Sequence, residues 1–181
     1  MGLRSIPGFL LLAGLLAAGA CAPAEKAGEE SAEASEEAPT PATEAALPEA
    51  DADAVWTYLT EADYHTWATW PGKGEKYAGT EPHGALLTTY VNAAALDAIN
   101  NAAGGMPAGA IIVKENFMPD STLAATTVMY KIEGYDPEHS DWWWMKRMAD
   151  GSVAAQGQVA TCQGCHGGKA DNDYIMTAAL K

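Results

Sequence analysis

Cys162-Gln163-Gly164-Cys165-His166 forms a C-x-x-C-H motif that ends fifteen residues before the C-terminus. Two thiols at this spacing can each form a thioether bond with a vinyl group of one haem, and the histidine that follows is then held at the iron as an axial ligand. A zinc site would need a second pair of ligands at a suitable spacing, and the three other histidines stand far upstream with no cysteine beside them. The motif therefore predicts one covalent haem c, attached through Cys162 and Cys165 and ligated by His166.

The position of the motif limits where a sixth iron ligand can come from. Met176 is the only methionine after it and lies ten residues beyond His166, which is too close in the chain to reach the opposite face of the haem. A sixth ligand must come from upstream, or the position is open. We interpret His83 as a surface loop histidine, with a distal or ligating role as the alternative.

The segments before the motif are rich in β-branched and aromatic residues and show the period-two pattern of strands. This pattern disfavours the four-helix cytochromes c′, in which the residues before the motif would follow a helical period. Asp150-Gly151 is a strong hairpin signal between the last two segments. Trp142-Trp143-Trp144 must point to both faces of its strand, so at least one ring packs away from the haem. The expected strands are residues 84–91, 110–117, 126–133, 142–149 and 153–159.

Short helices are expected at both ends of this set of strands. Thr60-Glu61-Ala62-Asp63 resembles a capping arrangement between two of them, and Asn92 is expected to cap an alanine-rich third. Successive strands with helices at the ends predict an α+β fold: a small antiparallel sheet with flanking short helices and a C-terminal helical segment that carries the motif. The expected helices are residues 53–59, 61–67, 93–102 and 172–180.

The N-terminal residues have the pattern of an export signal. Residues 9–20 are an apolar run of twelve residues, shorter than the roughly 20 needed to span a bilayer, so we interpret residues 1–20 as a signal peptide. Small residues lead to Cys21, as at a bacterial lipoprotein cleavage site, and we expect this cysteine to be lipidated; ordinary cleavage after Ala20 is the alternative. The expected location is the periplasmic side of a bacterial membrane, with the outer membrane favoured.

Most of the negative charge precedes the expected haem domain. The formal net charge is −14, and residues 22–53 hold ten acidic residues, one lysine and almost no large apolar side chain. Such a segment cannot bury enough surface to fold, so residues 21–53 are expected to be an acidic tether and residues 54–181 the haem domain. Nothing in the charge pattern suggests a nucleic-acid partner.

These features together resemble the cytochrome P-460 family and its relatives, the β-sheet cytochromes c′. The resemblance covers most of residues 60–175. It implies a small antiparallel sheet as one wall of the haem site, His166 as the proximal ligand, and an open or water-filled distal position. The matching stretches are Tyr64-x-x-Trp67, Thr89-Tyr90-Val91, Val113-Lys114-Glu115, Asp141-Trp142-Trp143 and Thr161-Cys162-x-x-Cys165-His166.

The resemblance also implies a second covalent link. In P-460 proteins, a lysine on the V-K-E strand is bonded to the porphyrin edge, and Lys114 is the matching position. Strand alternation places Ile112, Lys114 and Asn116 on one face of the sheet. A solvated lysine on the outer face is the alternative.

Two departures from the family pattern concern the distal side. The distal acid of the family has no clear counterpart, although Glu133, Asp136 and Asp141 lie in the corresponding region, and Glu133 and Asp136 are our candidate bases. The relatives without the cross-link cap the distal face with phenylalanines, and after the expected signal peptide this chain has only Phe117.

The implied function is oxidation of hydroxylamine, to N₂O or nitrite, with electrons leaving to a partner cytochrome. If Lys114 is free, binding or detoxification of NO is the alternative. An electron-transfer cytochrome with a methionine or histidine as sixth ligand is the rival from another class. The membrane would be contacted through the lipid anchor alone, and a homodimer is a further possibility that the sequence leaves open.

Overall fold

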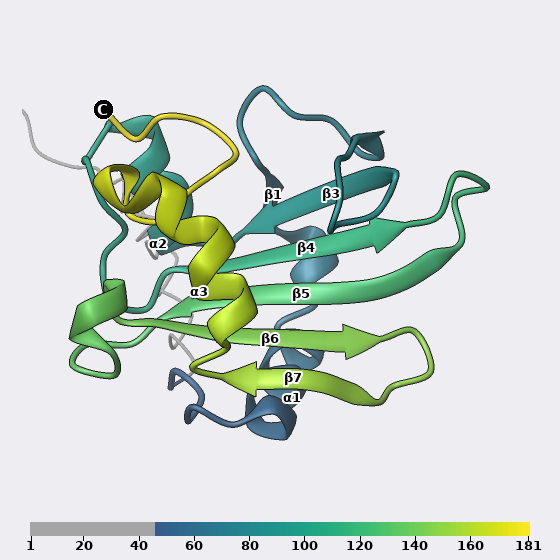
Figure 1. The fold of residues 1–181 in the computed structure, drawn as a ribbon, viewed down its shortest axis with the longest axis horizontal. Coiled ribbons are helices and arrows are strands. Elements are labelled where there is room, and N and C mark those ends of the chain that lie inside the picture. Colours follow the sequence, from purple (N-terminus) through teal and green to yellow (C-terminus); the bar gives the residue numbers. More distant parts are fainter. Residues whose placement is uncertain (1–45) are drawn as a thin grey trace, which may run out of the picture. The chain divides into compact units, whose positions relative to one another are not determined.

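The computed structural model describes residues 46–181, so the expected signal peptide, Cys21 and most of the expected tether lie outside the described residues. This part of the chain forms an antiparallel sheet with three short α-helices (Figure 1). The α+β expectation is therefore confirmed. None of the described helices is both long enough and apolar enough to span a membrane.

The sheet follows the chain closely. Its strand order is β1-β3-β4-β5-β6-β7, with β2 also paired to β3, and every pairing is antiparallel. Neighbouring strands on this path are thus consecutive in the chain, except that β2 lies between β1 and β3 in the sequence; α2 connects β3 to β4. The strands are β1 (Ala68–Thr69), β2 (Tyr77–Ala78), β3 (Leu86–Val91), β4 (Ile111–Phe117), β5 (Leu123–Lys131), β6 (Trp142–Met148) and β7 (Val153–Gly157).

The two faces of the sheet carry different helices. Helix α1 (Ala52–Glu61) lies behind the sheet in the view of Figure 1, and α3 (Ala160–His166) crosses in front of β4, β5 and β6. Helix α2 (Ala93–Asn100) packs with the α3 side of the core, because its buried Ala95 and Ala98 belong to that cluster. Three short 3₁₀ segments, η1 (Tyr64–Thr66), η2 (Pro137–His139) and η3 (Gly167–Asn172), complete the structure.

The tryptophans of β6 show how strand alternation divides the core. Trp142 and Trp144 belong to the cluster on the α3 face, and Trp143 belongs to the cluster on the α1 face with Val113 and Val128. Because successive strand residues point to opposite faces, three consecutive tryptophans serve both layers of the core. The expectation that at least one ring packs away from the motif is confirmed.

Two helix starts are fixed by side-chain caps. Asp51 accepts hydrogen bonds from the amides of Asp53 and Ala54, so α1 begins at Ala52, one residue before the expected start. Asn92 accepts from the amide of Ala95, as expected, and also from that of Ile111, which ties the start of α2 to β4. The chain is folded before residue 54: the Tyr130 hydroxyl donates to the carbonyl of Pro48 at 3.1 Å.

The expected capping arrangement after α1 is wrong. The Thr60 hydroxyl bonds back to the carbonyls of Trp56 and Thr57 within its own helix, and η1 has no side-chain cap. Asp63 instead adopts a left-handed conformation with φ of 44°. The threonine therefore satisfies carbonyl groups at the end of one helix and does not begin the next.

The expected C-terminal helix is also wrong. Residues 173–181 contain no helix, and the Asn172 side chain takes the place of helical hydrogen bonds. Its amide donates to the carbonyls of Ile175 (2.7 Å) and Ala178 (2.8 Å), and its oxygen accepts from the amide of Leu180 (2.9 Å). Asparagine offers such local alternatives to helix bonds, and here it folds the terminus into an irregular loop against α3.

Candidate functional site

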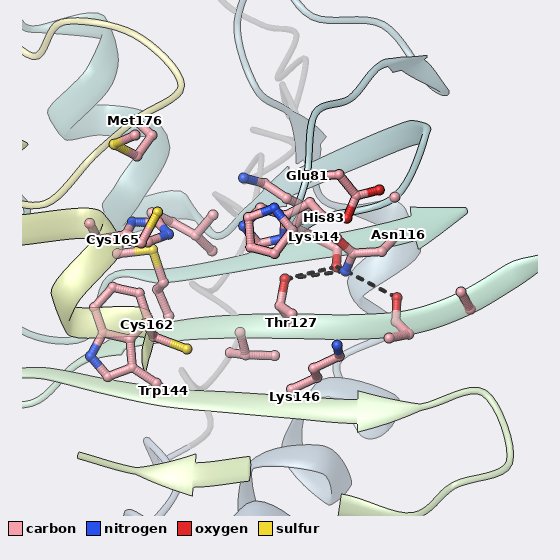
Figure 2. Close-up of a pocket in the computed structure, with 18 of the residues that line it drawn as sticks. Glu81, His83, Lys114, Asn116, Thr127, Trp144, Lys146, Cys162, Cys165 and Met176 are labelled. Atoms are coloured by element: carbon pink, nitrogen blue, oxygen red, sulfur yellow. Dashed lines mark hydrogen bonds between the residues drawn. The ribbon is translucent and has the colours of Figure 1, made fainter. Parts of the chain in front are cut away.

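A cavity of about 620 Å³ lies on the α3 face of the sheet. Its size is within the range of about 300–1,000 Å³ that is usual for sites of organic ligands. Its walls are the middle of β4, β5 and β6, the loop of residues 81–85, and the N- and C-terminal flanks of the motif. Figure 2 shows side chains around it from these elements, among them Cys162, Cys165, His83, Lys114, Asn116, Thr127, Trp144 and Lys146.

His166 reaches the cavity at the C-terminal end of α3 with its ring orientation fixed. Its Nδ1 atom lies 2.8 Å from the carbonyl oxygen of Tyr174, and a carbonyl can only accept, so Nδ1 carries the proton. The Nε2 atom is then an unprotonated nitrogen available to a metal. Burial lowers the pKa of His166, which also favours the neutral ring. The Trp144 ring packs against it with centroids 4.8 Å apart.

The two cysteines stand one helical turn apart on α3 and both line the cavity. Neither forms a disulfide; Cys165 is exposed and Cys162 is partly buried. Burial raises the pKa of the Cys162 thiol. Two thiols and an imidazole are thus presented together at the edge of one apolar cavity, as attachment of a haem c requires.

Lys114 lies on the cavity face of β4, as the family resemblance implied. It lines the cavity together with Ile112 and Asn116, whereas Ile111 and Val113 point into the core on the α1 face. Burial lowers the pKa of Lys114 to about 8, so roughly a tenth of the amine is neutral at pH 7, far more than for a lysine with the usual pKa. The alternative, a solvated lysine on the outer face of the sheet, is therefore wrong.

A second lysine lies two strands away on the same row. Lys114 pairs in register with Thr127 of β5, and Thr127 pairs with Lys146 of β6. Both lysines line the cavity, and within residues 46–181 neither makes an ion pair. A haem carries two propionate groups, so an unpaired ammonium group at the wall, such as that of Lys146, fits its charge.

His83 is part of the cavity wall, so its interpretation as a surface loop histidine is wrong. Its Nδ1 atom lies 2.9 Å from Oδ1 of Asn116. The Asn116 amide group donates to the carbonyls of Lys114 and Ala125, which fixes its oxygen as the acceptor toward His83. The pKa of His83 is lowered to about 4, mainly by burial. The ring is therefore neutral near pH 7, and its unprotonated nitrogen is Nε2. Sequence reasoning could not find this, because the contact joins residues 33 positions apart.

The acids named from the sequence lie elsewhere. Glu133 is exposed in the loop after β5 and does not line the cavity. Asp136 is buried, but its carboxylate accepts from the Gln163 side chain at 2.7 Å and contacts Nδ1 of His139 at 3.0 Å. It therefore holds α3 in place from outside the cavity. Asp141 bonds through its side chain to the amide of Asp136.

Glu81 is the only acidic residue among the described residues that line the cavity. It stands two positions before His83, in the loop that leads into β3, and its side chain is drawn above Asn116 in Figure 2. The sequence alone does not point to Glu81 as a site residue. Its one signal was proximity to His83 in the chain, and that signal has meaning only once His83 is known to face the cavity. Phe117 is buried but is not among the lining residues.

The described residues fit a haem and not a metal ion held by side chains alone. The cavity is mainly apolar, with two thiols, one oriented imidazole and two unpaired lysines at its walls. Within residues 46–181, no group of three His, Cys, Asp or Glu side chains could hold a metal ion.

Comparison with known proteins gives one family. The family model described as Cytochrome P460 matches residues 61–177, which is more than half of the chain and includes every cavity residue discussed above. The comparison with curated proteins gives no match.

Proposed function

The chain belongs to the cytochrome P-460 family and is a haem cytochrome of that type, and we propose that it carries one covalent haem c and oxidises hydroxylamine. One observation carries the proposal: Lys114 lines the same cavity as Cys162, Cys165 and His166. The four residues correspond to the thioether attachment, the proximal ligand and the porphyrin cross-link that the family resemblance implies.

Attachment of the haem would use residues that α3 already places together. Cys162 and Cys165 would form the two thioether bonds, and His166 would bind the iron through Nε2 while donating from Nδ1 to Tyr174. A hydrogen bond at Nδ1 increases the basicity of a ligating imidazole and fixes its orientation. Lys146 is available for a propionate group.

Lys114 would form the second link. Bond formation needs a neutral amine, and burial of Lys114 in the cavity wall favours that form. A bond from Nζ to a porphyrin carbon replaces an N–H and a C–H bond, so two protons and two electrons leave; the step would need a two-electron oxidant such as a peroxide, and the product lacks two hydrogens relative to the separate partners. The expected consequence is a distorted macrocycle with altered redox properties.

The haem iron, when bound, offers a coordination position for a small nitrogen compound and a route for its electrons. When two hydroxylamine molecules give N₂O and water, four protons and four electrons must leave, so a base near the substrate is required. Glu81 is the carboxylate that lines the cavity, and we propose it as this base in place of Glu133 and Asp136. The electrons would pass to a partner cytochrome.

Steady-state oxidation of hydroxylamine with an artificial electron acceptor tests this function. Turnover by the purified holoprotein, with N₂O or nitrite as product, supports the proposal. Lys114→Arg keeps the positive charge but removes the nucleophilic amine, and it should abolish most of the turnover with haem content unchanged. Tight binding of NO without any oxidation of hydroxylamine would contradict the enzyme and favour the NO-binding alternative.

Location and anchoring remain proposals from the sequence. Attachment of haem to C-x-x-C-H in bacteria occurs outside the cytoplasmic membrane, which supports export. We propose that Cys21 carries a lipid and that an acidic segment tethers the haem domain to the membrane surface.

A further inference from the structure

We infer that the ion pair between Lys131 and Asp173 positions the carbonyl group of Tyr174 and, through that carbonyl, the imidazole of His166. This inference rests on the proposed haem attachment, and it adds to the proposed function a pair of positioning residues that help to set the reduction potential of the haem. Neither Lys131 nor Asp173 lines the cavity, so neither is placed to touch the haem itself.

The first observation is that the backbone of Tyr174 is bonded on both sides to the segment before it. Its amide donates to the carbonyl of Lys169 at 2.8 Å, and its carbonyl accepts from Nδ1 of His166 at 2.8 Å. Asp173 and Tyr174 both adopt the left-handed conformation, with φ of 53° and 65°. Residues other than glycine keep this conformation only where the surrounding contacts hold it. The direction of the carbonyl therefore depends on what holds Asp173.

The second observation is that Asp173 is held from three separate parts of the chain. Its carboxylate accepts from Nζ of Lys131 on β5 at 2.6 Å and from the amide of Met106 at 2.7 Å. Its backbone carbonyl accepts from Nε1 of Trp142 on β6 at 2.9 Å. Lys131 and Trp142 are in register on neighbouring strands, and the ammonium group of Lys131 lies 4.7 Å from the centroid of the Trp142 ring. The residue before Tyr174 is thus fixed to the sheet.

The third observation is that this ion pair is buried. The side chains of Lys131 and Asp173 are 13% and 10% exposed, and within residues 46–181 Lys131 makes no ion pair with another acid. Loss of one partner leaves the other charge buried without its counter-ion, so the loop would have to rearrange. The ion pair of Arg147 with Asp53 differs, because the Asp53 side chain is 88% exposed.

These contacts have a consequence for the iron. A hydrogen bond at Nδ1 raises the basicity of a ligating imidazole, and a more basic ligand stabilises the ferric state relative to the ferrous state. If the carbonyl of Tyr174 moves, the bond to His166 weakens and the reduction potential rises. The ion pair therefore contributes to the potential at which the haem accepts electrons.

The test is the reduction potential of the Lys131→Met and Asp173→Asn holoproteins. A direct effect of charge on the haem would lower the potential when the positive charge of Lys131 is lost and raise it when the negative charge of Asp173 is lost. Positioning of His166 predicts that the potential rises in both variants. The double variant should show no more than the larger single shift, because both residues act through the same contact.

A second measurement is the iron–histidine stretching frequency of the ferrous protein, obtained by resonance Raman spectroscopy. The frequency should be lower in both variants, because the bond at Nδ1 of His166 is weaker; a direct effect of charge leaves it unchanged. Lys131→Arg keeps the ion pair and should keep the wild-type potential and frequency. If Lys131→Met does not fold, the frequency of Asp173→Asn decides between positioning and charge.

Arg147→Met is the matched control, because it removes a positive charge from the ion pair with Asp53 at α1, and both measured values should equal those of the wild type. A fall or no change in the potential of Lys131→Met would overturn the inference, as would an unchanged frequency in Asp173→Asn. None of these measurements uses hydroxylamine or Lys114, so failure of the proposed enzyme activity is distinguishable from failure of this inference.

Discussion

Nδ1 of His166 and the carbonyl oxygen of Tyr174 are 2.8 Å apart, and this contact links the motif to the C-terminal loop. Asp173, the residue before Tyr174, is itself held by two hydrogen bonds. Asp173 accepts from Nζ of Lys131 at 2.6 Å and from the amide of Met106 at 2.7 Å. Residues after the motif therefore orient the proximal imidazole, although none of them is expected to touch the iron.

Asn172→Ala tests the importance of this loop. The substitution removes three hydrogen bonds to Ile175, Ala178 and Leu180, and it should cost about 1–3 kcal/mol of unfolding free energy. Thermal unfolding of the holoprotein should show a decrease in Tm of roughly 2–12 °C. The reduction potential should rise, because a weaker hydrogen bond at Nδ1 makes His166 a poorer donor.

The control for this substitution is Asn101→Ala, because the Asn101 side chain bonds to Asp97 on the exposed surface of α2. It should leave the reduction potential unchanged. Equal potentials in wild type and Asn172→Ala would show that the loop does not orient His166.

Glu115→Ala tests the division of β4 into two faces. Glu115 accepts from the Tyr64 hydroxyl at 3.0 Å on the α1 face, and its removal leaves a buried hydroxyl unpaired at a cost of about 1–3 kcal/mol. Chemical denaturation should show this loss of stability. The absorption spectrum should not change, because the neighbouring Lys114 faces the other way. A changed spectrum would contradict the assignment of faces.

Replacement of the motif cysteines tests the covalent attachment. Cys162→Ala and Cys165→Ala should each remove one thioether bond, and the double variant should lose covalent haem, as measured by the pyridine haemochrome assay after acid–acetone extraction. Full retention of haem through the extraction in the double variant would contradict the attachment.

Glu81→Gln tests the proposed base. The amide keeps the size and polarity of the side chain but cannot accept a proton at neutral pH, so hydroxylamine turnover should fall by roughly 10²–10⁴-fold. Glu133→Gln is the control, because Glu133 is exposed outside the cavity and its replacement should leave turnover unchanged. Loss of turnover in Glu133→Gln together with normal turnover in Glu81→Gln would contradict the assignment and indicate Glu133 as the base.

The sequence predicted the sheet well because its signals are local. The alternation in residues 110–117 and the Asp150-Gly151 turn each depend on neighbouring residues, and both features appear in the structure as β4 and the β6–β7 hairpin. That Lys114 shares a face with Ile112 and Asn116 could also be predicted, because alternation needs only one strand; that this face meets the motif came from the family resemblance.

The site was harder to predict because its other members come together through long-range contacts. His83 faces the cavity because its ring is hydrogen-bonded to Asn116. Asp136 lies outside the cavity because its carboxylate is hydrogen-bonded to the side chain of Gln163. The expected last helix fails for a related reason: the Asn172 side chain competes with the backbone for the hydrogen bonds of the loop.

The intact mass of the purified holoprotein, combined with its ferrous absorption spectrum, tests the central claim most directly. The claim is that Cys162 and Cys165 attach a haem that Lys114 also binds. It predicts the mass of the mature chain plus one haem less two hydrogens, a haem-linked peptide that contains Lys114, and a broad band near the 460 nm of the family name. An unmodified Lys114 peptide together with an ordinary ferrous Soret band would contradict it.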